Sequence, residues 1–489
     1  MEDSNKYKFK KIKLTKLFNA FNHTIEINKN KGITLVLGEN GLGKTVILKL
    51  LKQVFEGNFI NLKNYEFERL DLFFEDFKYS FFGTVDDENL RLIAKKYKGK
   101  TVVEEFDFLN INYSSNFAQG SLFLETTIKG NKFENDFIRS SYIDPDEIDY
   151  LLRKYIGRFV KRIRKNEWRD LETGEILHTN SIIKKYRNRL PKRFDKLNIA
   201  PEWLKELSDR INVYIIETQR LRTRKGSENY IESITDISQE LAQTIKGLLA
   251  QANEFATQLD RTYPTRLLTK INDPETITET DLSQKLAELD NRRKRLKEVG
   301  LVEPFEDDIQ RNNLFFPHRG DNEPDRIDLI NNVLLVYIQD SNEKLNIYEK
   351  IADKLEVFIN ILNERLNVKR IQIDKEKGLD IKSTKVDEKP SKLNPNNSKK
   401  KRKQIPLTGL SSGEQHMIIL FYNLLFKCEE NSLILIDEPE ISLHIGWQNK
   451  FIEDLNRIKK INPFEAIIAT HSPDIINDNW DLTVELNED

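Results

Sequence analysis

A glycine-rich segment that directly follows an apolar run is the feature that most constrains this chain. The run Ile33–Leu37 predicts a buried strand, Gly38-Glu-Asn-Gly-Leu-Gly-Lys-Thr45 follows it, and the next residues have helical spacing. Strand, glycine-rich loop and helix in this order are typical of a P-loop, whose backbone N–H groups point at phosphate oxygens. We expect Lys44 to reach the β- and γ-phosphates and the Thr45 hydroxyl to bind Mg²⁺. The predicted nucleotide cradle comprises Gly38, Glu39, Asn40, Gly41, Leu42, Gly43, Lys44 and Thr45.

Two adjacent carboxylates end a second apolar run. The run begins at Ser432 and reaches Asp437, with Glu438 next to it. Ligands of parallel sheets lie at strand ends, so we expect Asp437 to hold Mg²⁺ and Glu438 to polarise the water that attacks the γ-phosphate. Acidic residues after a strand are usually solvated turn residues. Pairing with the P-loop favours the functional interpretation.

A third apolar run ends at a histidine. Ala466–Thr470 precedes His471, which could contact a γ-phosphate from that strand end. A lone histidine is more often structural, and its place at a strand end is what favours the site.

The segment Leu410-Ser-Ser-Gly-Glu-Gln415 opens an apolar helical run. Its hydroxyls and N–H groups could bind an anion or could simply cap the helix. The segment resembles the signature of the ABC-type ATPases and stands where that signature stands, ahead of the carboxylate motif. The resemblance implies an ATP-sandwich homodimer, within a homo-oligomer, in which the signature of one copy covers the ATP bound to another. The signature residues implied are Ser411, Ser412, Gly413 and Glu414.

Two further segments refine the resemblance. The strand-like stretch from Asn212 leads to Gln219, which resembles the Q-loop glutamine of the family and would touch Mg²⁺ or the attacking water. The phrase Glu438-Pro-Glu-Ile-Ser-Leu-His444 resembles the RecF, SMC and OLD branch more than transporter subunits. The implied fold is α/β: an ABC-type P-loop ATPase head with an antiparallel β lobe and an inserted helical or coiled-coil arm.

The chain divides into five expected parts. Apolar heptads suggest antiparallel coiled-coil arms, with a globular helical bundle as the alternative. Residues 383–404 have almost no apolar content and predict a disordered linker. The parts are the N-terminal head with the P-loop (1–143), a basic helical insertion (144–210), the Q-loop segment (211–226), the arm (227–368) and the C-terminal head (369–489).

A local excess of positive charge stands out in a balanced chain. The whole chain has 78 Lys+Arg against 79 Asp+Glu, whereas residues 153–193 contain fourteen basic and four acidic residues. This basic patch is either a solvated helical face or a surface for DNA or an acidic protein. Aromatic residues are few in it, so base stacking on single strands is not predicted.

The chain of 489 residues has one cysteine and no apolar run long enough to cross a bilayer, so we expect a cytoplasmic protein without a membrane partner. Few residues follow His471, so a Toprim nuclease domain of the OLD kind would have to belong to another chain. The overall organisation resembles the ATPase subunits of PARIS-type and Septu-type anti-phage systems. That resemblance implies an oligomeric sensor scaffold that controls an effector nuclease (Toprim-type or HNH-type) and responds to an acidic phage trigger or DNA at the basic patch. A DNA-repair or chromosome ATPase of the RecF/SMC kind, binding duplex DNA, is the alternative, and a transporter subunit is a third.

Overall fold

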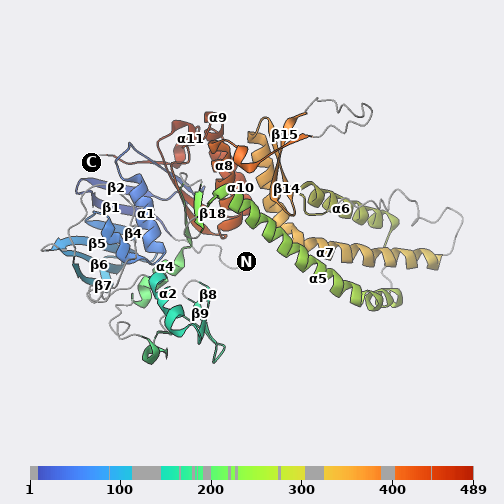
Figure 1. Cartoon of the computed structure of the whole chain (residues 1–489), viewed down its shortest axis with the longest axis horizontal. Coiled ribbons are helices and arrows are strands. Elements are labelled where there is room, and N and C mark those ends of the chain that lie inside the picture. Colours follow the sequence, from blue (N-terminus) through green and yellow to red (C-terminus); the bar gives the residue numbers. More distant parts are fainter. Residues whose placement is uncertain are drawn as a thin grey trace. The chain divides into compact units, whose positions relative to one another are not determined.

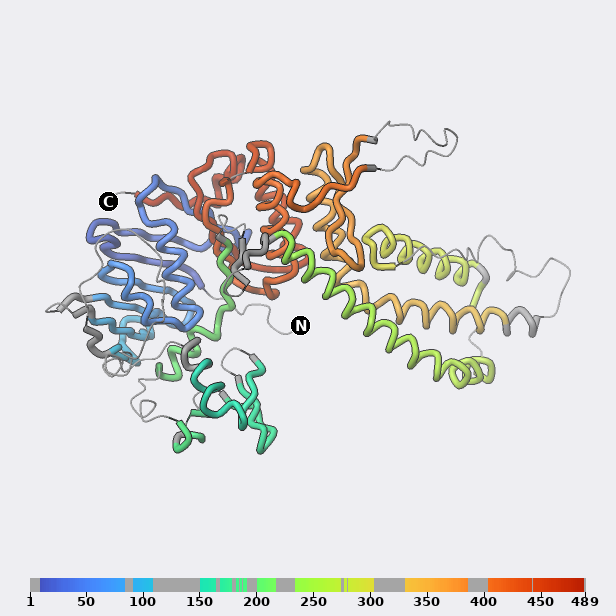
Figure 2. The backbone as a smooth tube through the Cα atoms, viewed as in Figure 1, coloured from blue at the N-terminus to red at the C-terminus, as the bar shows by residue number. Residues whose placement is uncertain are grey.

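The computed structural model describes most of the chain, in two compact units. The described residues are 9–86, 89–112, 145–164, 167–178, 182–183, 185–190, 200–217, 222–225, 229–273, 277–302, 324–386, 402–441 and 443–487. The first unit comprises 1–217, 429–439 and 464–489, and the second comprises 218–428 and 440–463. Each unit is described by itself below, and Figures 1 and 2 trace the elements of both.

A parallel sheet carries the apolar runs in the first unit. Its strand order is β11 (Val213–Glu217), β17 (Ser432–Asp437), β18 (Phe464–Thr470), β3 (Ile33–Leu37) and β19 (Thr483–Glu485), and every neighbouring pair is parallel. The interior strands β17 and β18 are buried almost throughout, as continuous apolar strands of parallel sheets are. The three predicted strands at the motifs are therefore present and lie side by side.

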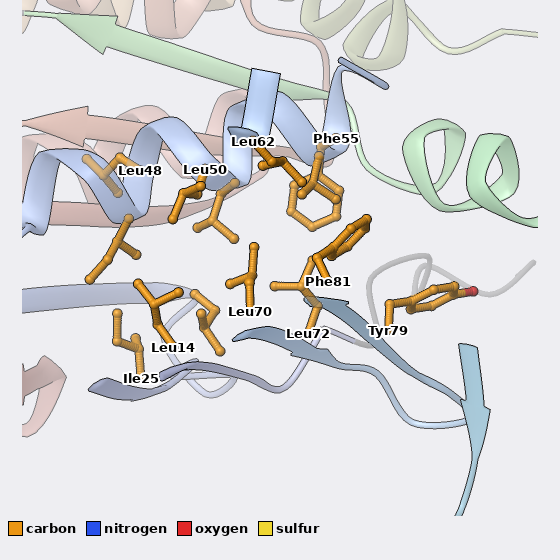
Figure 3. Packing of buried hydrophobic residues seen from close by; sticks show 14 of the residues in the cluster. Leu14, Ile25, Leu48, Leu50, Phe55, Leu62, Leu70, Leu72, Tyr79 and Phe81 are labelled. Atoms are coloured by element: carbon orange, nitrogen blue, oxygen red, sulfur yellow. The ribbon is translucent and has the colours of Figure 1, made fainter. Parts of the chain in front are cut away.

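An antiparallel sheet forms the other layer of this unit. Its order is β2 (Phe21–Glu26), β1 (Lys11–Leu17), β4 (Arg69–Phe73), β5 (Lys78–Asp86), β6 (Asn89–Lys98) and β7 (Thr101–Asn112). Helix α1 (Lys44–Phe55) buries one face against this sheet, where Leu48 and Leu50 meet Leu14 and Leu70 (Figure 3). The same helix contacts β11, β17 and β18, so it lies between the two sheets. This arrangement confirms the predicted P-loop head with an antiparallel β lobe.

A small subdomain within the first unit contains the basic patch. It consists of α2 (Pro145–Ile156), β8 (Val160–Arg164), β9 (Glu167–Asp170) and β10 (Ile176–His178), with a core around the fully buried Trp168. Helix α4 (Glu202–Arg210) follows, and Trp203 stacks on Tyr79 of the β lobe. The segment expected to be a helical insertion thus includes a small antiparallel sheet, because its many charged residues obscure the strand alternation.

Long helices dominate the second unit. Helices α5 (Ser233–Asn272) and α7 (Pro324–Arg365) run side by side and antiparallel (Figure 1), since Asp260 pairs with Lys344 and Arg266 with Asp340. Helix α6 (Glu279–Glu298) lies along α7, where Arg292 and Arg295 bind Glu349. Many of the apolar residues that form the predicted heptads are buried, namely Ile234, Leu241, Ile245, Ala252, Leu259, Leu282, Leu286, Leu289, Leu296, Ile338, Leu345, Ala352, Leu355, Leu362 and Leu366.

The remainder of the second unit surrounds the base of these helices. Strands β14 (Lys369–Asp374), β15 (Gly378–Val386) and β16 (Arg402–Ile405) form an antiparallel sheet. Helix α8 (Ser412–Tyr422), a π-helical turn (Asn423–Lys427), α9 (Ile445–Gln448) and α10 (Phe451–Ile461) complete it. The predicted linker 383–404 is therefore structured at both ends, where Val386 pairs with Arg402, because backbone pairing needs no apolar side chains. Residues 387–401 lie outside the described residues.

Candidate nucleotide-binding site

The register of the parallel sheet aligns the predicted motifs at one edge. Asp437 on β17 is level with Ala469 on β18, and Thr470 is level with Leu37 at the end of β3. On the other side of β17, Glu217 at the end of β11 is level with Asp437. The carboxyl ends of all four strands therefore meet at the edge where ligands of such sheets bind. The predicted Gln219 lies outside the described residues, beyond the end of β11.

The loop between β3 and α1 has glycines where side chains would not fit. A Cβ on Gly38 would lie 3.0 Å from Leu42 Cδ1, and one on Gly43 would lie 2.3 Å from Leu17 Cδ2. Gly41 and Gly43 have φ of 97° and 87°, a left-handed conformation that favours glycine. Glu39, Asn40 and Gly41 are exposed. These glycines allow the tight curl of the backbone that a phosphate cradle requires.

Lys44, the first residue of α1, folds back over this loop. Its ammonium donates to the carbonyl oxygens of Gly38 at 2.6 Å and Glu39 at 2.9 Å, and the side chain is buried. A buried ammonium needs such partners because its desolvation is costly. These bonds hold the one cationic group of the loop against the backbone of Gly38 and Glu39.

Thr45 and Asp437 come together across the sheet edge, although they are far apart in sequence. The Thr45 hydroxyl lies 3.0 Å from Oδ1 and 2.9 Å from Oδ2 of Asp437, to which it donates. Hydroxyl and carboxylate oxygens are the hard donors that Mg²⁺ prefers, and it takes its other ligands from phosphate and water. The donor set at this edge therefore fits the magnesium ion that accompanies a nucleoside triphosphate.

Glu438 adopts an unusual backbone conformation beside this pair. Its φ is 45°, and its N–H donates to the carbonyl oxygen of Ala469 at 2.9 Å. A left-handed conformation at a non-glycine residue costs roughly 1–3 kcal/mol and is found most often at functional sites. Pro439 follows, which restricts the backbone of Glu438 further. The carboxylate is thus presented from a sharply turned segment directly after β17.

His471 follows the last residue of β18. It is exposed, whereas its neighbours Thr470 and Ser472 are buried, and the Ser472 N–H donates to the Thr470 hydroxyl at 3.0 Å. This turn ends β18 and places His471 at the same sheet edge as Asp437. Lys44, Thr45, Asp437, Glu438 and His471 thus all belong to one edge of one sheet.

The turn between β1 and β2 adds residues that the motifs do not reveal. Phe18 has φ of 54°, is 41% exposed, and its Cε2 lies 3.4 Å from the Cβ position of Gly43. On β2, His23 donates from Nε2 to the carbonyl oxygen of Leu42 at 2.8 Å, and burial lowers its pKa. Phe18 and His23 therefore pack against the P-loop, although they lie in a different part of the sequence. The only sequence signal was an aromatic residue in the turn between the first two strands.

The predicted signature residues lie in the second unit, at the start of α8. Ser411 accepts from the Glu414 N–H at 3.3 Å, and the Glu414 carboxylate accepts from the Ser411 N–H at 2.7 Å, which forms a capping box. Ser411 and Ser412 remain exposed, whereas Gly413 is buried. The Lys369 ammonium on β14 donates to both Glu414 oxygens, at 2.7 and 2.6 Å. These contacts fix the helix start, engage the Ser411 hydroxyl in the capping box and leave Ser412 exposed.

A lysine-capped glycine loop, a hydroxyl–carboxylate pair and a parallel sheet edge together define a P-loop nucleotide-binding protein. The chain belongs to a family with this site: the profile of the AAA ATPase domain matches residues 8–476. Among the described residues, no helix combines the length and apolar character needed to cross a membrane.

A search of curated proteins finds a short match to protein ea59 of Escherichia phage lambda. The two sequences are 39% identical over 74 residues, which is 15% of this chain and 14% of the length of that relative.

Solved structures that resemble the chain include heads of SMC proteins. The Smc head domain of Pyrococcus furiosus bound to the C-terminal domain of ScpA matches with a TM-score of 0.28 and 15% identity, over 96% of this chain and 90% of that one. The SMC head domain from Thermotoga maritima matches with a TM-score of 0.32 and 11% identity, over 98% and 95%. At these scores the description of the fold rests on the sheet topology given above.

Proposed function

We propose that the chain binds ATP with Mg²⁺ at the edge of the parallel sheet and hydrolyses it to ADP and phosphate. The observation that carries this proposal is the hydrogen-bonded pair of Thr45 and Asp437 beside the buried ammonium of Lys44. When bound, Mg²⁺ supplies positive charge that stabilises the transferred phosphoryl group. Thr45 and Asp437 would hold the ion, and Gln219 would join them from the segment after β11.

The remaining roles follow from position at the same edge. Glu438 would accept a proton from the attacking water and orient it, since a carboxylate after the strand is the nearest candidate base. His471 would donate a hydrogen bond to the γ-phosphate from the end of β18. Phe18 would support the adenine, because its exposed ring lies at the P-loop glycine Gly43.

We further propose that hydrolysis requires two copies of the chain. The exposed Ser411 and Ser412, with Gly413 and Glu414, would cover the ATP bound to the P-loop of the partner copy. The exposure of the helix start supports this role, because Ser412 is exposed beside Ser411, whose hydroxyl belongs to the capping box. A helix N-terminus favours negative charge such as a γ-phosphate.

The biological role we favour is that of an oligomeric sensor scaffold in anti-phage defence, in the cytoplasm. ATP-dependent closure of the homodimer would hold an effector nuclease of Toprim or HNH type, and an acidic phage protein or DNA at the basic patch would release it. The support is the resemblance of the sequence to PARIS-type and Septu-type ATPase subunits. A DNA-repair or chromosome ATPase that binds duplex DNA is the second candidate, favoured by the antiparallel pair α5 and α7.

Affinity purification from native cells separates the two roles. The bait is the Glu438→Gln variant in ATP, in which hydrolysis is blocked and the closed state should persist, compared with Lys44→Ala, which should not close. Recovery of a nuclease that is lost after phage infection would support the sensor role. Recovery of duplex DNA and recombination proteins, independent of infection, would overturn it in favour of the repair ATPase.

A further inference from the structure

A pocket lined with basic residues lies in the small subdomain of the first unit, outside the proposed nucleotide site. Its volume is about 800 Å³, within the ~300–1,000 Å³ typical of ligand sites. It opens beside the end of α2 and the start of β8. The polar residues that line it are Arg153, Lys154, Tyr155, Arg158, Lys161 and Arg162.

A tight turn at Gly157 concentrates these charges. The Gly157 N–H donates to the Arg153 carbonyl oxygen at 3.2 Å, and a Cβ on Gly157 would lie 2.3 Å from the same oxygen. A side chain there would force the turn open. Because the turn reverses the chain so closely, Arg158 and Lys161 line the same pocket as Arg153.

The wall behind the charges is rigid and apolar. Trp168 is fully buried, Phe159 stacks on Tyr186 with ring centroids 5.7 Å apart, and the Arg189 guanidinium lies 4.0 Å from the centre of the Phe159 ring. Such packing fixes the shape of the pocket before any ligand binds. Most aromatic residues of the basic patch are therefore part of its core, whereas Tyr155 is 41% exposed.

The described residues that line the pocket include five basic side chains and no acidic one. Arg153, Arg158 and Lys161 are all exposed. The buried carboxylate of Asp170 is engaged elsewhere, since it accepts from Lys185 and from the Tyr186 hydroxyl. The partial negative charge at the end of α2, about half a unit, offsets only a fraction of this charge.

We propose that this pocket binds the phosphate groups of a single-stranded nucleic acid. One guanidinium group can donate to two phosphate oxygens at once. Three arginines, Arg153, Arg158 and Arg162, line this pocket. A flexible single strand can enter a pocket of this size, whereas the two backbones of a stiff duplex cannot bend into it. Although the few aromatic residues of the patch did not predict base stacking, the ring of Tyr155 is exposed, lies with its centroid 5.7 Å from the Lys154 ammonium and offers a face for one base.

This inference deepens the proposed function, which leaves the ligand of the basic patch open between DNA and an acidic protein. It rests on that function only for the role of the bound strand as a signal. Binding itself needs no nucleotide, so a measurement without ATP distinguishes failure of this site from failure of the ATPase.

The test is fluorescence anisotropy of a labelled single-stranded 20-mer of mixed sequence with the full chain, without ATP, over a range of salt. The test variant carries Arg158→Ala and Lys161→Ala, and its matched control carries Lys98→Ala and Lys100→Ala in the exposed turn between β6 and β7. We expect the test variant to bind at least ten times more weakly. Its salt slope should fall by about 1.4, the value for two lost phosphate contacts on a single strand. The control should bind as the wild type does.

Further arms identify the ligand class. Tyr155→Ala should weaken binding of the strand a few-fold without changing the salt slope, because stacking releases no counterions. Wild-type affinity in the double variant would overturn the site. Tighter binding of a duplex of equal length would overturn the proposal in favour of duplex DNA, and displacement by polyglutamate at equal charge would overturn it in favour of an acidic protein.

Discussion

The ammonium of Lys369 bonds to both carboxylate oxygens of Glu414, which itself caps the start of α8 through Ser411. Lys369 begins β14, the strand that follows α7, and its ion pair connects this strand to the start of α8, where the proposed signature residues lie. Both side chains are mostly shielded from water, at 17% and 12% exposed, which strengthens the ion pair. We therefore expect a shift of α7 and β14 to disturb the start of α8.

Replacing Lys369 by Met should lower ATP turnover several-fold and leave ATP binding to the P-loop unchanged. The Glu414 carboxylate would lose its cation while staying mostly shielded from water, which should loosen the helix start by roughly 1–3 kcal/mol. Steady-state hydrolysis and fluorescent-nucleotide binding report the two quantities. Lys382→Met on the same sheet is the control, since Lys382 pairs with Asp380 away from α8. Equal loss of activity in both variants would contradict a specific link.

Glu438→Gln and Lys44→Ala should fail in different ways. The first removes the proposed base and keeps the fold of the edge, so ATP should stay bound and a dimer should accumulate. The second removes the ammonium that bonds to Gly38 and Glu39, so ATP affinity should fall. Single-turnover hydrolysis and light scattering in ATP distinguish the outcomes. Turnover at the wild-type rate in either variant would refute the assigned roles.

Phe18→Ala should raise the KM for ATP several-fold with little change in kcat. The exposed Phe18 ring next to Gly43 would stack on the adenine of ATP. Full stacking of a nucleobase on an aromatic ring contributes ~1–3 kcal/mol. A comparison with inorganic triphosphate, which has no base, is the decisive measurement. The variant and the wild type should bind triphosphate equally, and an equal loss for both ligands would assign Phe18 to loop packing instead.

The apolar runs allowed the parallel sheet edge to be predicted from sequence, because β3, β17 and β18 are continuous buried strands that end in motifs. Tertiary contacts between residues far apart in the sequence could not be predicted in this way. Nothing in the local sequence connects Lys369 to Glu414, or His23 to the carbonyl of Leu42, since each pair is formed by the tertiary fold. The sheet β8 to β10 was missed because charged residues occupy its exposed positions, and the roles of Gln219 and the signature residues stay predictions.

The folded state should become less stable below neutral pH because of His23. Burial lowers the pKa of His23 in the folded chain. Below the unfolded pKa of about 6.5, the unfolded state therefore binds more protons than the folded state, and the unfolding free energy decreases as the pH is lowered. His23→Gln keeps a donor for the Leu42 carbonyl and cannot be protonated. The difference in unfolding free energy between wild type and variant should therefore shrink or reverse from pH 7 to pH 5, with a slope of at most ~1.4 kcal/mol per pH unit. His416, whose pKa is lowered by burial as well, is present in both proteins and cancels in this difference. Parallel curves would show that His23 does not titrate in this range.

The helix pair α5 and α7 should depend on one ion pair. Pro264 interrupts the backbone hydrogen bonds of α5, and Arg266 turns back to donate to the Leu259 carbonyl at 2.7 Å and to Asp340 on α7. The Asp340 carboxylate is 10% exposed, so losing the guanidinium leaves a nearly buried charge without its cation. Arg266→Ala should therefore lower the unfolding free energy of the helices by roughly 1–3 kcal/mol, measured by urea titration of the helical signal.

Lys344→Ala is the matched control, because it removes the Lys344–Asp260 ion pair between the same two helices. Asp260 is 71% exposed, so this variant should cost less than about 1 kcal/mol. Equal destabilisation by the two variants would mean that the Arg266–Asp340 ion pair contributes no more to stability than a surface ion pair.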